Sequence, residues 1–179
     1  MRPWRGAAYR VTTLEYPSPK SILLGQGSYL YGGRWNAIGS FRVVYGSTTD
    51  VVAVAESRAN AEYAGISLPF RTPRLLVTVD LVLARVIDLT IPETMRRLFP
   101  GRQNQGAEDW RRMQNRGEES ESQAFGRACF EHGANGLIAS SARVLDGINV
   151  MYFPENCSDP AEAKVYEAEK LDRIRGEDA

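Results

Sequence analysis

The sequence predicts an α+β fold organised as one domain. Several short runs rich in β-branched and aromatic residues, each bounded by Pro, Gly or Ser, are typical of strands. An alanine-rich run with capping residues at its start is typical of a helix. Strands and helices follow one another without a regular βαβ alternation, which favours α+β over a doubly wound sheet. The 179 residues are enough to bury a sizeable core, so a single domain over 1–179 is expected.

The first half of the chain predicts strand, turn region, strand, helix and strand. Thr49 or Asp50 can cap the helix, and Gly65 can end it because glycine readily adopts the left-handed conformation. The last of these segments alternates apolar and polar residues, with a bend expected near Asp80. The predicted elements are a strand at 7–13, a glycine-punctuated turn region at 25–40, a strand at 41–47, a helix at 49–65, and one or two strands within 74–90.

The second half begins with a polar segment and ends with strands and a helix. A short helix is expected near Pro92, and the charged stretch that follows, up to Gln123, predicts a surface excursion with helical pieces because it has no clear apolar face. The remaining predicted elements are a helix at 120–132, strands at 136–142 and 148–154, and a C-terminal helix at 159–175.

Composition limits the possible functions. The chain has 22 basic and 22 acidic residues, which removes the main electrostatic reason to expect nucleic-acid binding. No apolar run approaches the roughly 20 residues that a membrane span needs, and the N-terminus lacks the apolar core of a secretory signal. We therefore expect a cytoplasmic protein that binds neither nucleic acid nor membrane. The two cysteines, Cys129 and Cys157, are too few and too far apart for a disulfide framework or a zinc site.

Common catalytic motifs are missing from the sequence. It contains none of GxGxxG, GxxxxGK[ST], HExxH, CxxC or GxSxG. Its one histidine, His132, stands beside Gly133 at an expected helix end, where a capping or surface role is usual. A Ser-His-Asp hydrolase or a His-ligated metal enzyme would depend on that residue alone, so we expect neither. The remaining candidates for chemistry are Arg, Tyr, Glu and Ser residues.

Arg34 stands in a glycine-rich loop that can present it to a ligand. Gly32 and Gly33 allow a positive φ or a close approach of the backbone, and a guanidinium fork suits a phosphate or pyrophosphate. Taken alone, the local sequence favours a tight hairpin turn with a surface arginine and Trp35 packed on the core. Tyr45 ends the apolar strand that follows, where a core tyrosine is the common outcome.

Glu56 is expected at one edge of the buried face of the helix at 49–65. With about 100° per residue, Glu56 falls about 20° beyond one edge of the apolar stripe. Glu62 borders the other edge, so helix geometry does not choose between the two. A carboxylate at the core boundary needs a partner or a pocket, because an unpaired buried charge is unfavourable. The stripe consists of Val52, Ala55, Ala59, Tyr63 and Ile66.

Several segments along most of the chain form a recognisable set. They are Tyr9–Arg10, GGRWNAIG at 32–39, VVYGS at 43–47, AVAES at 53–57, GLIASSAR at 136–143 and NVMYFPE at 149–155. The ordered combination of GGRWN, VY and a helix with A-x-x-E is more specific than any one of them. On these segments the chain resembles the RES domain, the toxin component of bacterial RES-Xre toxin–antitoxin pairs. The stretch at 104–122 matches no motif.

The resemblance implies a fold and an activity. RES proteins are similar to ADP-ribosyltransferase-fold enzymes, with a split mixed β-sheet core, flanking helices and a cleft that binds NAD. Family members break the nicotinamide–ribose bond of NAD+, either degrading NAD by hydrolysis or phosphorolysis or transferring ADP-ribose to a protein. NAD+ is consumed as a substrate, and neither a metal nor a separate cofactor is implied. An Xre-family antitoxin or an immunity protein that occludes the cleft is the implied partner.

The resemblance also implies catalytic and NAD-binding residues. They are Arg34 of GGRWN, Tyr45 of the VY strand, Glu56 of the helix, and Ser141, which the following Ala-Arg favours over the adjacent serine. The helix motif likewise favours Glu56 over the second glutamate of that helix.

Each of these residue types suits a role in breaking the bond. A carboxylate such as Glu56 stabilises the oxocarbenium character of the ribose and can hold an incoming nucleophile. Arg34 is expected to hold phosphates, Tyr45 to pack on the nicotinamide or its ribose, and Ser141 to hydrogen-bond the ribose or carboxamide. Trp35 and Asn36 are expected to support the loop that carries Arg34.

Three functions remain open from the sequence. The first is a toxin that depletes NAD and arrests growth, and the second is a toxin or effector that transfers ADP-ribose to a protein. The third is a catalytically silent module held by an antitoxin. The motifs do not specify whether water, phosphate or a protein side chain accepts the ADP-ribose. A toxin that acts in its own cell and an effector exported without a cleavable signal would share all these features.

Overall fold

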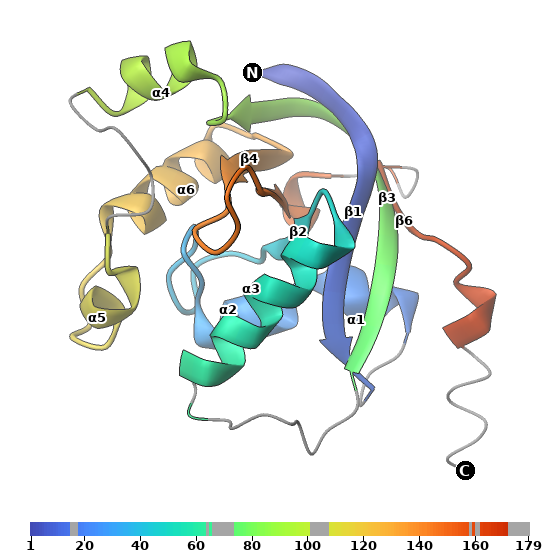
Figure 1. Ribbon diagram of the computed structural model, residues 1–179. Coiled ribbons are helices and arrows are strands. Elements are labelled where there is room, and N and C mark those ends of the chain that lie inside the picture. Colours follow the sequence, from blue (N-terminus) through green and yellow to red (C-terminus); the bar gives the residue numbers. More distant parts are fainter. Residues whose placement is uncertain are drawn as a thin grey trace.

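The computed structural model describes residues 1–14, 18–63, 65, 74–100, 108–157, 159 and 162–171. Within these residues six strands form one sheet, and helices pack around it (Figure 1). The strands are β1 Arg2–Thr13, β2 Val44–Ser47, β3 Arg74–Asp88, β4 Gly136–Ser140, β5 Ile148–Tyr152 and β6 Ala163–Val165. The helices are α1 Pro19–Leu24, α2 Gln26–Tyr31, α3 Asp50–Tyr63, α4 Pro92–Leu98, α5 Trp110–Gln114 and α6 Glu121–Glu131, with a 3-10 turn at Pro154–Asn156. None of the described helices is long and apolar enough to cross a bilayer.

The sheet is mixed, and its pairings form a circuit. Strands β1 and β3 are antiparallel along nearly their whole length, with Tyr9 opposite Thr78 (Figure 1). The circuit continues from β1 through β2, β5 and β4 back to β3, and only the β3–β4 pairing among these is parallel. In the described residues β1 and β2 share one register pair, Tyr9 with Ser47. The predicted α+β class, with a mixed sheet and flanking helices, is confirmed.

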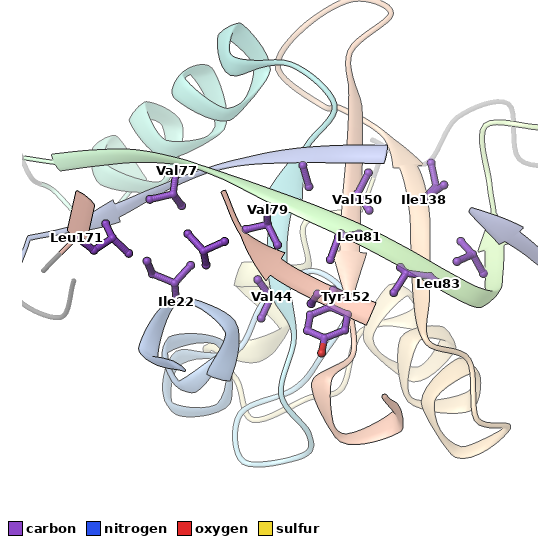
Figure 2. Packing of buried hydrophobic residues seen from close by; sticks show 14 residues of the cluster. Ile22, Val44, Val77, Val79, Leu81, Leu83, Ile138, Val150, Tyr152 and Leu171 are labelled. Atoms are coloured by element: carbon purple, nitrogen blue, oxygen red, sulfur yellow. The ribbon is translucent and has the colours of Figure 1, made fainter. Parts of the chain in front are cut away.

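Two apolar clusters hold the sheet to its helices. Strand alternation separates them, because successive side chains point to opposite faces. Val44 and Val150 belong to the first cluster, whereas Met151 is buried in the second and Tyr45 packs against it. Figure 2 shows the first cluster gathered along β3 and reaching Ile22 of α1. The second consists of Trp35, Phe41, Val43, Leu89, Phe99, Cys129, Ala134, Leu137, Ala139, Met151 and Phe153.

The C-terminal helix predicted at 159–175 is wrong at residues 163–165, and positions 160, 161 and 172–175 of that prediction lie outside the described residues. Residues 163–165 form β6, which pairs antiparallel with β3 and places Val165 opposite Val79. Ala163 and Val165 are buried while Lys164 is exposed, which is the period of a strand. Pairing with β3 and burial of these two side chains outweigh the helix propensity of the segment.

Two other expectations need adjustment. The turn region predicted at 25–40 contains the helix α2, which starts directly after Gly25 in the left-handed conformation. Within the segment 74–90, Arg74–Asp88 form one continuous strand, β3, without the bend expected near Asp80. Pairing with β1 along its length stabilises this long strand as a single unit.

Helix α3 buries a different face from the one predicted. Thr49 caps it, since its hydroxyl accepts a hydrogen bond from the Val52 N–H at 3.3 Å. The buried residues are Val52, Ala53 and Ala61, whereas Tyr63 is 55% exposed. The small side chains allow close contact with the sheet, and this contact rather than the largest side chain sets the rotation of the helix. Ile66 lies outside the described residues.

Gly126 marks a point where α6 lies against the backbone of the glycine-rich loop. A Cβ at this position would overlap the carbonyl oxygen of Trp35, so we expect Gly126→Ala to destabilise the fold by about 3 kcal/mol, as overpacking does. Gly27→Ala is the matched helical control, because a Cβ there meets nothing within 4 Å. Urea unfolding of both variants checks this, and equal stability of the two would contradict the close approach.

Candidate active site

The loop that carries Arg34 is a tight turn closed by its own backbone. Gly33 and Asn36 pair across it, and the Gly33 N–H donates to the Asn36 carbonyl at 2.8 Å. Arg34 and Trp35 occupy the turn between them. Gly32 precedes it with a φ of 70°, a conformation that favours glycine. Because Trp35 is 3% exposed and packs in the second cluster, it anchors the turn to the core.

Side-chain hydrogen bonds of Asn36 and Tyr45 hold this turn in place. The Asn36 amide donates to the carbonyls of Ser28 and Phe41 at 2.8 and 3.2 Å, and its Oδ1 accepts from the Tyr45 hydroxyl at 2.9 Å. The same hydroxyl accepts from the Trp35 N–H at 3.0 Å. Burial raises the pKa of Tyr45 well above its ordinary value, which keeps the phenol protonated and able to donate.

Helix α6 holds the turn from the other side. The side-chain amide of Gln123, which is fully buried, donates to the Gly33 carbonyl at 3.0 Å and to Gln114 Oε1 at 2.9 Å. Ser120 and Gln123 form a capping box at the start of α6, which orients the amide. The turn is therefore held on both sides before any ligand binds.

Arg34 lies among other charged groups. Burial lowers the pKa of Arg34 from its ordinary value, and the negative charges of Glu108 and Glu56 oppose this effect. The positive charge of Arg143 adds to the lowering. An arginine keeps its charge even when partly buried, so the turn presents a fixed cation.

Glu56 is held by two neutral donors. Its Oε1 accepts from the Ser141 hydroxyl at 2.7 Å and from the Asn149 amide at 2.8 Å. Within the described residues, no hydrogen bond reaches Oε2. Glu56 lines the pocket described below, whereas Glu62 is exposed and does not line it. Of the two glutamates that helix geometry left open, Glu56 is the one at the site.

The Ser141 hydroxyl contacts Glu56 and not the interior of the pocket. Its one hydroxyl proton goes to Glu56, and its oxygen accepts from the N–H groups of Arg143 and Val144 at 3.0 and 3.2 Å. Ser141 is not among the described residues that line the pocket. Its hydroxyl is thus already engaged, which favours a positioning role over the direct contact with ribose or carboxamide that the resemblance implies.

Arg34, Tyr45 and Glu56 line a cavity of about 450 Å³, within the range of small-molecule sites. Among the described residues that line it, five are arginines and one, Glu56, is a carboxylate. The arginines are Arg10, Arg34, Arg74, Arg111 and Arg143. Such a lining suits a ligand with several negative oxygens and one site of positive charge. The described residues contain no group of three or more His, Cys, Asp and Glu side chains able to hold a metal.

Arg111 of α5 closes one end of this cavity against α3. Its guanidinium lies over the rings of Trp110 and Tyr63, at 4.3 and 4.6 Å from their centroids, and donates to the Asn60 side chain. Burial lowers the pKa of Arg111, as do the positive charges of Arg143 and Arg34. Three arginines from separate segments therefore lie close enough to repel one another, a cluster that an anion would stabilise.

Comparisons with known proteins agree with the motifs. The family model of the RES domain matches residues 7–174. The chain belongs to the RES domain family. A solved structure, the M. tuberculosis MbcT–MbcA toxin–antitoxin complex, contains a chain similar to this one, with a TM-score of 0.71 and 22% identity over 98% of this chain and 91% of that chain. A search of curated protein sequences finds no significant match.

The structure adds residues that the sequence interpretation of this RES domain missed. Arg10 lies in a matching segment, Tyr9–Arg10, to which the resemblance assigns no role. Its guanidinium is buried and donates to the Tyr45 carbonyl at 2.8 Å, and burial lowers its pKa. Asn149 likewise begins a matching segment, where it is the one polar residue of an otherwise apolar strand apart from the Tyr152 hydroxyl. Arg111 lies in the stretch without motifs, and no sequence signal pointed to it.

The hydroxyl of Tyr45 gives a test of its role in the RES domain. Tyr45→Phe would leave the Trp35 N–H and Asn36 Oδ1 without this partner, so we expect a loss of about 1–3 kcal/mol in the free energy of unfolding. Tyr31→Phe is the control, because Tyr31 is 75% exposed and surface changes usually stay within about 0.5 kcal/mol. Denaturant unfolding measures both. Unchanged stability of Tyr45→Phe would mean that the hydroxyl does not hold the turn.

Proposed function

We propose that this RES domain protein cleaves the nicotinamide–ribose bond of NAD+, degrading NAD by hydrolysis or phosphorolysis and so arresting growth. The observation that carries the proposal is the pocket whose described lining residues include five arginines and a single carboxylate, Glu56. The membership of the chain in the RES family supports it.

The carboxylate suits the reacting end of NAD+. As nicotinamide leaves, positive charge develops on the ribose, and a nearby carboxylate stabilises it. Glu56 is held by a hydroxyl and an amide, which are neutral and leave its negative charge uncancelled. Its Oε2 is available to hold an incoming oxygen nucleophile, and a general base of this kind is worth about 10²–10⁴-fold in rate.

The arginines suit the pyrophosphate. Arginine presents several donors in a fork that matches phosphate oxygens. Within the described residues Arg10 Nε is buried without a hydrogen-bond partner, and a buried donor of this kind favours a ligand that supplies an acceptor. The mutual repulsion of Arg34, Arg111 and Arg143 is relieved by the same ligand charge.

We also propose that the protein is the toxin of a toxin–antitoxin pair and acts in the bacterial cytoplasm. The similar solved structure is that of a toxin–antitoxin complex, and the fold is shared over 98% of this chain. The proposed partner is an Xre-family antitoxin or immunity protein that occludes the pocket. A partner that covers the arginine-lined opening would block entry of the dinucleotide.

Release of nicotinamide tests the reaction. Purified protein mixed with NAD+ is expected to release nicotinamide, and Glu56→Gln is expected to lower kcat by at least about 100-fold, since the neutral amide cannot stabilise the developing charge. Glu62→Gln is the matched control on the same helix and should retain the wild-type rate. Nicotinamide is measured by chromatography, with and without inorganic phosphate.

The products decide between acceptors. Free ADP-ribose indicates hydrolysis, a phosphorylated ADP-ribose that appears only with phosphate indicates phosphorolysis, and label on a protein indicates transfer. The absence of nicotinamide release by the wild type, both with and without inorganic phosphate, would contradict the proposed function.

Arg111 tests the proposed pyrophosphate site independently. We expect Arg111→Ala to raise KM for NAD+ about tenfold, because a charge-assisted hydrogen bond to phosphate contributes about 1.5 kcal/mol or more. The exposed residue Arg97 of α4 does not line the pocket, and Arg97→Ala should leave KM unchanged. Steady-state kinetics measures both, and an unchanged KM in Arg111→Ala would remove this residue from the binding site.

A further inference from the structure

We infer that Asn149 is a positioning residue for Glu56 and that Ser47 sets the orientation of Asn149. The expected effect on the reaction rate rests on the proposed function. The geometry rests on hydrogen bonds among the described residues. Neither residue is part of the Arg, Tyr, Glu and Ser set that the motifs supplied.

The sheet brings Ser47 and Asn149 together. They are direct partners in the antiparallel pairing of β2 and β5. Ser47 lies two residues from Tyr45 and Asn149 two from Met151, so all four side chains point to the face that lines the pocket. A shift of one residue in this pairing would turn the whole set away from the pocket.

The direction of the hydrogen bonds fixes the amide. A serine hydroxyl has one proton, and that of Ser47 goes to Asn149 Oδ1 at 2.7 Å. The nitrogen of the amide must then face the other way, where it donates to Glu56 Oε1 at 2.8 Å. Ser47 is 2% exposed, so water does not compete readily for its hydroxyl. The orientation of the amide is therefore set by the protein.

The two donors to Glu56 select which carboxylate oxygen meets the ligand. Asn149 and Ser141 both donate to Oε1. Oε2 receives no hydrogen bond within the described part of the chain, and the residue lines the pocket. The chain of hydrogen bonds from Ser47 through Asn149 to Glu56, called the relay below, thus directs Oε2 to the substrate. An arginine in place of Asn149 would hold the carboxylate equally well but would cancel the charge that the transition state needs.

The relay also links the helix to the sheet. Ser47 ends β2, and α3, which carries Glu56, begins at Asp50. The connection is only two residues long, and its start is fixed by the pairing of Ser47 with Asn149. The short connection therefore positions the backbone of α3, and the Asn149 side chain positions the carboxylate of Glu56.

Kinetics of three variants and one control variant test the inference. We expect Asn149→Ala and Ser47→Ala to lower kcat with little change in KM for NAD+. Asn149→Ala should lower kcat on the order of 100-fold, as small misplacements of a catalytic group do. Asn149→Asp keeps the shape but places a second negative charge beside Glu56, so it should lower kcat at least as far. Thr48→Ala removes a neighbouring hydroxyl that donates to the Ile148 carbonyl at 3.4 Å and makes no contact with Asn149 or Glu56 among the hydrogen bonds of the described residues, so it should behave as wild type.

A double variant separates positioning from a general structural role. In the Glu56→Gln background, Asn149→Ala is expected to lower the remaining rate no further, because residues that act through one group are non-additive. An additive loss, or a rise in KM with unchanged kcat, would overturn the inference.

A carboxyl ¹³C spectrum gives a readout that needs no activity. The signal of Glu56, identified by its loss in Glu56→Gln, should move in Asn149→Ala and in Ser47→Ala and stay in place in Thr48→Ala. No movement in the first two variants would overturn the inference even where wild type releases nicotinamide. If the signal moves in these two variants but the wild-type protein releases no nicotinamide, the result would instead support the relay and refute the proposed function.

Discussion

The buried side chain of Asn36 is the constraint on which the rest of the site depends. It is 0% exposed and satisfies two backbone carbonyls and the hydroxyl of Tyr45 at once. In a dry interior each of these groups would be costly to leave unpaired. The turn between Gly33 and Asn36 therefore has one arrangement, and Arg34 at its corner has a fixed place above the pocket.

The side of the pocket that carries Glu56 is positioned by different contacts. There the sheet register, rather than a buried amide in a loop, sets the geometry, since Ser47 and Asn149 pair directly and together orient Glu56. The two sides of the pocket meet at Tyr45, which lies on β2 and holds the turn with its hydroxyl. A fixed cation and a fixed carboxylate thus face one cavity, a charge arrangement that suits the proposed cleavage of a dinucleotide at its glycosidic bond.

Local sequence patterns predicted the strands and helices whose formation depends on residues nearby in the sequence. The strands at β1, β2, β4 and β5 and the helix α3 with its Thr49 cap follow from periodicity and capping. Parts that depend on distant contacts could not be predicted this way. Strand β6 depends on its pairing with β3, and the rotation of α3 depends on its contact with the sheet. Arg111 lines the pocket where it contacts Tyr63 and Asn60, which are distant in the sequence. The motifs supplied Arg34, Tyr45, Glu56 and Ser141, but the engagement of the Ser141 hydroxyl is visible only in the structure.

A crystal structure of the Glu56→Gln variant with NAD+ would test the central claim most directly, because slow turnover should preserve the intact dinucleotide. We predict the nicotinamide ribose beside residue 56 and the pyrophosphate against Arg34 and Arg111. NAD+ bound outside this cavity, or bound in it with the adenosine end beside residue 56, would contradict the central claim.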